Sequence, residues 1–586
     1  MTHHFVIFVV LWSLTVWVNG FPTSKNKLQF DSKSSEPHFA PSAWFEKQDS
    51  RTSGSFKSIG KSIECWACAG ALDIAIWKFK EPDGSYPGLL DFVTKMCEEL
   101  KIESSAVCKG IVIAMGNETL YLLKRLNLTG SEVCGLIFPH ACPAADLSWN
   151  RKHWTIPLPP KNNVKIVHKK RKESVIKVLQ LSDIHVDMQY KPGSVVDCSD
   201  PLCCRSDEQT SGQNSHAGYW GSAGSCDTPY WTLENLLSHA ASVQKYDYII
   251  WTGDLPAHND WNQSRSGQTF LLTNLTSLLL KYFPNTPVYP ALGNHESDPV
   301  NSFPPNYISG YNNISWLYDA LARAWSPWLP LDSIETVKQS GYYTVLIKPN
   351  FRLVSLNMNY CNNENFWMLV DPVDPNGELK WLVDTLSHAE VQGEAVHIIG
   401  HIPPAVGEDC LKVWRSNYYA IINRFRDTVV AQFFGHTHTD EIELMYSDES
   451  LLHPVAIAYI CPSVTTYPNL YPGYRIYDVR PGSWSIENHY TYILNLTEAN
   501  SRTSPPKWTL EYDAKSAYNI TDLSVYSWHR LFWQWLGTDS SDSRFANYYN
   551  YFYKSRPPRA VCDVQCKKHL LSRITAANFT QFSYSL

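Results

Sequence analysis

The sequence predicts an α/β layered sandwich, joined to a small all-α disulfide-bonded module and to a helical C-terminal region. Three observations support this fold class. Five short apolar runs between residues 175 and 440 each end in a cluster of polar residues, which is typical of strands in a buried α/β sheet. Six cysteines are concentrated in residues 61–146. Aromatic, helix-like stretches, WHRLFWQWL and NYYNYFY, follow residue 498.

The length and composition predict a globular protein with several domains. The chain has 586 residues, of which 44% are hydrophobic and 18% are charged, and it is too long for one ordinary domain. The formal net charge of −6 provides no strong basic field, so we expect no nucleic-acid partner. We also expect a monomer.

The N-terminus predicts export from the cell interior. Residues 5–18 are apolar, and tolerable residues precede a cut after residue 20. This pattern is typical of a secretory signal peptide over residues 1–20, followed here by an N-terminal linker over residues 21–60. The run is too short for a confident membrane span, and no other stretch approaches that length. We therefore expect no transmembrane segment and a secreted or lysosomal protein.

Cysteines and sequons agree with export. Fifteen cysteines suggest disulfides formed in an oxidising compartment. Eight N-x-Ser/Thr sequons predict a glycoprotein. The sequons are Asn117, Asn127, Asn262, Asn274, Asn313, Asn495, Asn519 and Asn578.

Residues 61–146 predict a helical module held by disulfides. Apolar residues recur at three- and four-residue spacing in LLDFVTKMCEEL and VCKGIVIAMGNETLYLLKRL. Six cysteines allow many pairings, and their spacing selects none of them. The first two form CWAC, but no βαβ unit surrounds them, so a redox or zinc motif is disfavoured. The six are Cys65, Cys68, Cys97, Cys108, Cys134 and Cys142.

A Pro-rich linker over residues 147–174 follows, containing IPLPPKN and HKKRKE. Proline stiffens such a connection. We expect the basic run at residues 168–172 to be a solvated face, with a processing site or a contact to anionic lipid headgroups as the alternatives.

The predicted catalytic domain, residues 175–497, is built on the five apolar runs. They are VIKVLQLSDIH, YDYIIWTGD, VYPALGNHE, AVHIIGHIPP and VVAQFFGHTH. In such sheets ligands gather at the carboxyl ends of the strands. A glycine precedes four of the polar clusters, where we expect it to let the backbone turn sharply toward an ion. These glycines are Gly253, Gly293, Gly400 and Gly435.

Seven residues in these clusters predict a metal site. Their oxygen and nitrogen donors suit divalent ions, and they suffice for two ions if one carboxylate bridges. Two metals about 3.5–4 Å apart direct water at a phosphoryl centre. A single Asp or His after a strand is usually a turn former or a helix cap, but five clusters with one pattern argue against that interpretation. The seven are Asp183, His185, Asp254, Asn294, His401, His436 and His438.

The motifs DIH, GD, GNHE, GH and GHTH, in this order over residues 175–465, resemble those of the calcineurin-like metallophosphoesterases. The resemblance implies two ligand sets that share Asp254. One ion would take Asp183, His185, Asp254 and His438, and the other would take Asp254, Asn294, His401 and His436. Nitrogen ligands suit Zn²⁺, although the mixed set would also accept Mn²⁺ or Fe.

The six-cysteine module resembles saposin B-type domains, which meet lipid surfaces. That resemblance implies the pairs Cys65–Cys142, Cys68–Cys134 and Cys97–Cys108. The alternative is that the apolar stripes of the module are only its core.

Most of the chain, including DCSDPLCCR, GNHESDPVNSFPP and LNMNYCNNENFW, resembles the acid sphingomyelinase family. This implies two zinc ions per chain and a sphingomyelin-containing membrane as partner, met peripherally through the saposin domain. The implied disulfides are Cys198–Cys203, Cys204–Cys226, Cys361–Cys410 and Cys562–Cys566. Cys461 is left over, and its apolar surroundings favour an inert buried thiol.

The expected reaction is hydrolysis of sphingomyelin to ceramide and phosphocholine by a two-metal-activated water. The ceramide alkoxide needs a proton, and we expect His295 to supply it, with His258 as a phosphate-binding partner. For both histidines a capping or core role is the alternative. Asn294 could both ligate a metal and donate to a phosphoryl oxygen. The loop with Tyr360, Glu364, Phe366 and Trp367 could bind the choline group, although the chain is rich in aromatic residues.

The sequence is also compatible with two other functions. One is a secreted phosphodiesterase that acts on nucleotides or other phosphodiesters. The other is a non-enzymatic saposin-like lipid-binding protein. The C-terminal region, residues 498–586, could pack on the catalytic domain or extend a membrane-facing surface.

Overall fold

The computed structural model describes residues 69–70, 73, 89–99, 101–125, 129–131, 154–161, 174–205, 216–448, 450–501, 505–537, 542–557 and 560–575. The chain forms two compact units, residues 1–102 with 123–151, and residues 103–122 with 152–586. The predicted signal peptide, the N-terminal linker and the basic run lie outside the described residues. So do four predicted cysteines and two sequons, namely Cys65, Cys68, Cys134, Cys142, Asn127 and Asn578.

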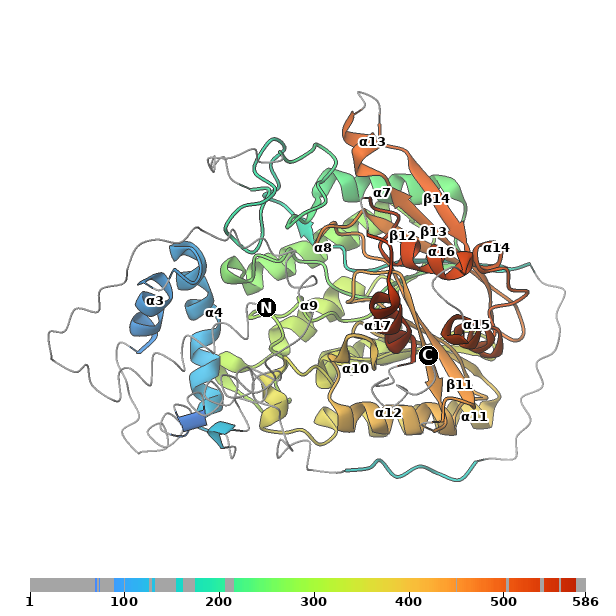
Figure 1. Cartoon of the computed structure of the whole chain (residues 1–586). Coiled ribbons are helices and arrows are strands. Elements are labelled where there is room, and N and C mark those ends of the chain that lie inside the picture. Colours follow the sequence, from blue (N-terminus) through green and yellow to red (C-terminus); the bar gives the residue numbers. More distant parts are fainter. Residues whose placement is uncertain are drawn as a thin grey trace, which may run out of the picture. The chain divides into compact units, whose positions relative to one another are not determined.

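The larger unit is built on two six-stranded sheets (Figure 1). The first has the order β14-β13-β12-β1-β4-β5, and the second has the order β10-β11-β9-β8-β7-β6. In the first sheet the strands are β1 (Ile176–Leu181), β4 (Tyr248–Trp251), β5 (Val288–Pro290), β12 (Gly473–Val479), β13 (Ile486–Leu494) and β14 (Trp508–Asp513). In the second they are β6 (Tyr343–Lys348), β7 (Phe351–Ser355), β8 (Ala395–Ile399), β9 (Val429–Phe434), β10 (Glu441–Tyr446) and β11 (Pro454–Ile460). A small pair, β2 (Val186–Asp187) and β3 (Thr228–Pro229), lies apart.

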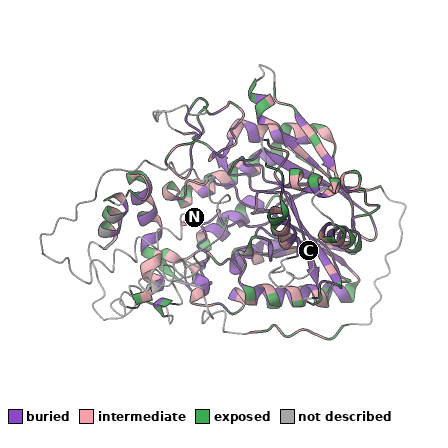
Figure 2. Cartoon of the chain, in the orientation of Figure 1, coloured by how far each residue is buried: buried purple, intermediate pink, exposed green. Residues whose placement is uncertain are grey.

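The five apolar runs form β1, β4, β5, β8 and β9, as predicted. β1, β4 and β5 are parallel to one another, and β8 and β9 are parallel neighbours in the other sheet. Nearly all of their residues are buried (Figure 2), which explains why these strands read as continuous apolar runs. The α/β layered fold is therefore confirmed.

Buried polar and aromatic side chains join the two sheets. Gln180 of β1 donates from Nε2 to the Phe434 carbonyl of β9 at 3.1 Å and accepts from the Tyr477 hydroxyl at 2.8 Å. The rings of Phe433 and Tyr477 also meet, with centroids 4.9 Å apart. These contacts join the two sheets near the ends of β1 and β9. Because the polar clusters follow directly after these strands, clusters from both sheets lie close together.

Helices flank the sheets of the larger unit. They are α7 (Tyr230–Val243), α8 (Arg265–Tyr282), α9 (Ser315–Trp325), α10 (Leu331–Ser340), α11 (Glu378–Gln392), α12 (Lys412–Arg424) and α13 (Leu496–Ser501). Short 3-10 turns are η2 (Asp260–Asn262), η3 (Gly310–Asn312), η4 (Met358–Tyr360), η5 (Phe366–Leu369), η6 (Pro375–Gly377) and η7 (Val406–Glu408). In the predicted saposin segment the described helices are α3 (Leu89–Glu99) and α4 (Ser105–Leu123). No described helix is both long enough and apolar enough to cross a membrane.

The C-terminal region packs on the sandwich. It contains α14 (Ala514–Tyr518), α15 (Val525–Gly537), α16 (Ser543–Phe552) and α17 (Val564–Thr575), so it is mainly helical as predicted. α15 lies on β10 and β11, and Arg573 of α17 forms a two-pronged ion pair with Glu441 of β10, both bonds 2.7 Å. One detail differs from the prediction: the proposed boundary at residue 497 divides a sheet, because β14 pairs with β13.

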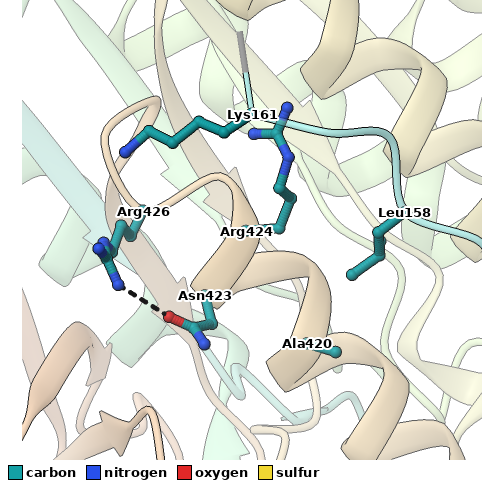
Figure 3. Close-up of a pocket in the computed structure, with 6 residues that line it drawn as sticks. All are labelled: Leu158, Lys161, Ala420, Asn423, Arg424 and Arg426. Atoms are coloured by element: carbon teal, nitrogen blue, oxygen red, sulfur yellow. Dashed lines mark hydrogen bonds between the residues drawn. The ribbon is translucent and has the colours of Figure 1, made fainter. Parts of the chain in front are cut away.

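Residues 154–161 of the Pro-rich linker lie against α12. Arg424 donates to the carbonyls of Pro159 and Pro160, both at 2.7 Å, and binds Glu390 through two bonds of 2.9 Å. A cavity of about 340 Å³ between the linker and α12 is lined by Lys161 and by other basic side chains (Figure 3). α12 leads into the start of β9, so this cavity lies at the opposite end of the sheet from the polar clusters.

Candidate two-metal active site

The structure brings the seven predicted ligand residues together at the carboxyl ends of five strands. Asp183 and His185 follow β1, Asp254 follows β4, Asn294 follows β5, His401 follows β8, and His436 and His438 follow β9. Three groups have donor atoms within 4.8 Å of one another. They are Asp183 with His185 and Asp254, Asp254 with His401 and His436, and His185 with His258 and His438.

Asp254 lies between the two halves of the cluster. Its Oδ2 is 3.0 Å from His401 Nε2 and 3.4 Å from His185 Nε2. On one side, His438 Nε2 is 3.6 Å from Asp183 Oδ1. On the other side, His436 Nδ1 is 3.1 Å from Asn294 Oδ1 and 3.2 Å from His401 Nε2. Asp254 thus lies close to histidines of both sets, within 3.0 Å of one and 3.4 Å of the other.

The histidine tautomers fit a cation site. The Nδ1 atoms of His185, His401 and His438 each face a backbone carbonyl oxygen at 2.6–2.7 Å. Nδ1 therefore donates, and in the neutral ring, which is the form that binds a metal, Nε2 carries a lone pair. His185 Nε2 and His438 Nε2 nevertheless lie 3.2 Å apart. Two lone pairs at that distance repel each other, and a cation between them removes the conflict, so these residues fit a divalent metal.

The carboxylates are held and tuned by backbone groups. Asp183 accepts from the His436 amide at 2.8 Å, and Asp254 accepts from the His295 amide at 2.9 Å. Burial opposes ionisation of Asp254, but the neighbouring histidines, His401 foremost, outweigh it and hold the pKa of Asp254 well below its ordinary value. The Glu296 carboxyl accepts hydrogen bonds from the amides of Asp254 and Leu255 and so holds the turn that follows β4.

Five of the candidate ligands have left-handed backbones. The φ angles are +49° for Asp183, +38° for His185, +59° for Asp254, +73° for His436 and +63° for His438. Such conformations are strained outside glycine and concentrate at functional sites.

The glycines before the ligands serve a different purpose from the predicted sharp turn at three of the four positions. Gly253 alone has a positive φ, +92°. A Cβ at Gly435 would lie 1.9 Å from Ser182 Oγ, and one at Gly293 would lie 2.2 Å from Asp254 Oδ1. At Gly400 the obstruction is Met358, at 2.7 Å. At these three positions glycine is needed because side-chain atoms of nearby residues leave no room for a Cβ. The predicted sharp turn at these positions is therefore wrong.

His295 and His258 stand beside the cluster, each with an acidic partner. His258 Nδ1 is 2.9 Å from Asp227 Oδ1, and His295 Nδ1 is 3.4 Å from Asp260 Oδ1. The two rings are 4.8 Å apart, and His258 stacks on His185 at 4.0 Å. The sequence interpretation missed both aspartates. Asp260 had one signal, its position two residues after His258, whereas Asp227 had only its place beside Cys226.

The pKa values of the two histidines are shifted in opposite directions. Burial lowers the pKa of His258, and the Asp227 carboxylate does not fully offset it. Burial also opposes protonation of His295, but Asp254 and then Asp260 outweigh it and raise the pKa of His295 to about 10. His295 therefore holds a proton more tightly than His258 does.

The predicted choline loop is corrected in part. Tyr360 is completely buried, and its hydroxyl lies 2.8 Å from the Tyr318 hydroxyl. Trp367 is also buried, and its Nε1 donates to Ser302 Oγ at 3.2 Å. These rings are core residues and do not line an open pocket. Glu364 is half-buried and accepts from Asn301 Nδ2 at 2.8 Å.

Helix α4, from the predicted saposin segment, packs within the larger unit against the loops that contain Trp261, Ser302 and Trp367. Glu118 accepts from Ser302 Oγ, and the Tyr121 ring is 5.4 Å from the Trp367 ring. A Cβ at Gly110 would lie 2.0 Å from the Trp261 carbonyl oxygen, so the helix and the loop after β4 touch closely. Burial raises the pKa of Glu118 to about 7, although Ser302 opposes the shift.

Disulfides tie several loops of the larger unit. The bonds Cys198–Cys203, Cys204–Cys226, Cys361–Cys410 and Cys562–Cys566 are present, which confirms these four pairs. Cys97 and Cys108 are each disulfide-bonded. Cys461 is a buried free thiol, and burial raises its pKa, as expected of an inert side chain.

The chain is similar to known phosphodiesterases along most of its length. Residues 176–440 match the Calcineurin-like phosphoesterase family, and residues 453–585 match the Acid sphingomyelin phosphodiesterase C-terminal region. The chain is 42% identical over 518 residues to Sphingomyelin phosphodiesterase of Homo sapiens, covering 86% of this chain and 80% of that protein. It is 34% identical over 550 residues to Sphingomyelin phosphodiesterase 1 of Caenorhabditis elegans, covering 92% and 95%. It is 32% identical over 404 residues to a cyclic GMP-AMP phosphodiesterase of Rattus norvegicus, covering 66% and 86%.

Proposed function

The chain belongs to the sphingomyelin phosphodiesterase family, and from this premise we propose that it hydrolyses sphingomyelin to ceramide and phosphocholine at a two-metal site. The observation that carries the proposal is the convergence of seven ligand-type residues at one edge of the sandwich, beside His295, whose ring faces Asp260. The metal ligands alone would be compatible with many phosphoesterase activities. A proton donor beside them suits a substrate whose leaving group is a basic alkoxide.

The proposed ligand sets follow the two sides of Asp254. Asp183, His185 and His438 would hold one ion together with Asp254 on one side. Asn294, His401 and His436 would hold the other ion together with Asp254. We propose zinc for both sites, because four of the seven ligands are imidazoles. When bound, the two ions lower the pKa of the attacking water and neutralise charge on the phosphoryl oxygens.

The protein's own groups would position the substrate and move the proton. His295 would protonate the ceramide oxygen as its bond to phosphorus breaks. His258 donates from Nδ1 to Asp227, so its Nε2 would bind a phosphoryl oxygen only after protonation. Asn294 turns Oδ1 toward His436, which leaves its amide NH₂ to donate to a phosphoryl oxygen.

We further propose that the protein is a monomeric glycoprotein of the secretory pathway, lysosomal or secreted, which meets membranes peripherally through its saposin segment. Three sequon asparagines, Asn117, Asn262 and Asn519, are exposed and open to glycosylation. Mass spectrometry of the secreted protein before and after deglycosylation would test the glycans.

Phosphocholine release from sphingomyelin vesicles, measured across pH with and without added zinc, tests the substrate, the metal and the acid dependence together. ATP and cyclic GMP-AMP should be assayed in parallel, because a relative is named for the latter substrate. Turnover of the nucleotides without turnover of sphingomyelin would favour the nucleotide phosphodiesterase. Fewer than about one bound metal ion per purified chain would favour a non-enzymatic lipid-binding protein.

A further inference from the structure

Lys554 is a buried lysine that none of the steps above uses. It follows α16, has a left-handed backbone with φ +56°, and its side chain is inaccessible to solvent. Its ammonium donates to the Ser463 carbonyl at 3.0 Å, to Ser463 Oγ at 2.7 Å and to the Thr465 carbonyl at 3.4 Å. All three partners are neutral oxygens. Burial of an ammonium without a carboxylate in contact is unfavourable, so its retention calls for an explanation.

The segment held by this ammonium, residues 462–467, contacts the metal cluster through its backbone. We call it the Ser463 loop. The Ser463 amide donates to the His438 carbonyl at 3.3 Å, and the Thr465 amide donates to the Asp183 carbonyl at 2.9 Å. The Tyr467 carbonyl accepts from His438 Nδ1 at 2.6 Å and sets the tautomer of that ring.

The Ser463 loop also supports the second histidine of the site. Thr465 Oγ1 donates to Asp227 Oδ1 at 2.8 Å, and Asp227 in turn holds His258 Nδ1. The Tyr467 ring stacks on the His258 ring, with centroids 4.2 Å apart. One short loop therefore contacts two candidate ligands, Asp183 and His438, on one side and the Asp227–His258 pair on the other.

We propose that Lys554 is a positioning residue, whose ammonium gathers the carbonyls of the Ser463 loop and thereby holds Asp183, His438 and the Asp227–His258 pair in their working geometry. The packing leaves little freedom for another arrangement, because a Cβ at Gly473 would lie 3.2 Å from Lys554 Cδ. The consequence is that the C-terminal region supports the site through Lys554, which acts by positioning the Ser463 loop. The expected effect of Lys554 on kcat rests on the proposed function, whereas its contacts with the Ser463 loop do not.

The test compares Lys554→Met, which keeps the length and removes the charge, with Lys567→Met as a matched control. Lys567 is also a buried lysine of the C-terminal region, and it packs over Phe545, with Nζ 5.1 Å from the ring centroid. Each folded variant would be assayed on p-nitrophenyl phosphocholine and on sphingomyelin vesicles, with bound metal measured by mass spectrometry.

We expect Lys554→Met to lower kcat about 10- to 100-fold on both substrates, the usual effect of removing an outer-shell support. KM should stay within about twofold, and metal should be lost more readily than from Lys567→Met. Equal kcat and equal metal retention in the two variants, at matched thermal stability, would overturn the proposal. If wild-type protein turned over only the nitrophenyl substrate, the sphingomyelinase proposal would fail while the comparison of the two lysines still stood.

A second variant covers the case in which Lys554→Met does not fold. Ser463→Ala removes one of the three acceptors and keeps the lysine. We expect a smaller fall in kcat, with KM unchanged. Where both single variants fold, a double-mutant cycle should show that their effects on kcat are not additive. Wild-type kcat in Ser463→Ala, or full additivity in the cycle, would overturn the positioning role.

Discussion

The substitution His295→Gln removes a proton from the edge of the metal cluster while keeping a side chain that can donate a hydrogen bond. In the metal-free protein Asp254 and then Asp260 raise the pKa of His295 to about 10, so the wild-type imidazole holds its proton at acid pH. Glutamine cannot give up a proton to a leaving alkoxide. The loss should therefore fall on the step in which the bond from phosphorus to ceramide breaks.

The size of the loss follows from what a general acid contributes. A positioned acid accelerates such a step by about 100- to 10,000-fold, which corresponds to about 3–5 kcal/mol of transition-state stabilisation. His295 is predicted to ligate no metal, so metal content should be retained.

The assay compares two substrates that share phosphocholine and differ in the leaving group. Hydrolysis of sphingomyelin should fall by the full factor in His295→Gln. Hydrolysis of p-nitrophenyl phosphocholine should fall far less, since nitrophenolate leaves without a proton. Equal losses on the two substrates would refute the assignment of His295 as the leaving-group acid. Loss of metal from the variant would instead show that His295 has a structural role.

Three further predictions concern neighbouring carboxyl groups. Asp260→Asn removes a partner that raises the pKa of His295, so the alkaline limb of the pH–rate profile should move to lower pH; an unchanged limb would contradict this. Asp254→Asn should abolish turnover and reduce bound metal from two ions toward none, measured by mass spectrometry against Asp260→Asn as control. Burial raises the pKa of Glu118 from 4.5 to about 7, so the contact of α4 is strongest below pH 4.5 and loses up to about 3 kcal/mol as pH rises to 7. In Glu118→Gln, hydrogen exchange over residues 105–122 should lose that pH dependence, and wild-type dependence in the variant would count against it.

The sequence supplied the strands and the seven ligand-type residues because each signal is local. An apolar run followed directly by Asp, Asn or His marks both a buried strand and its active end. The partners of His258 and His295 could not be found in this way. Asp227 reaches His258 from a position 31 residues earlier in the chain, and no local pattern links the two.

Burial decided the points that sequence interpretation got wrong. Tyr360 sits in a loop next to polar residues, so its sequence context suits a binding surface as well as a core. Only the packing against Tyr318 shows that it is interior. The role of Lys554 was equally hidden, since a lysine near the C-terminus is usually a solvated side chain.

The left-handed backbones at the candidate ligands narrow which amino acids can occupy these positions. Asn, Asp and His enter that conformation several times more often than other residues with a side chain. The same three residue types supply the oxygen and nitrogen donors of the site. Glutamate at position 183 would keep a carboxylate but would have to hold φ near +49° with a longer side chain. Some exchanges that are conservative in ligand chemistry are thus disfavoured by the main chain, so metal coordination is not the sole constraint on the residue types at these positions.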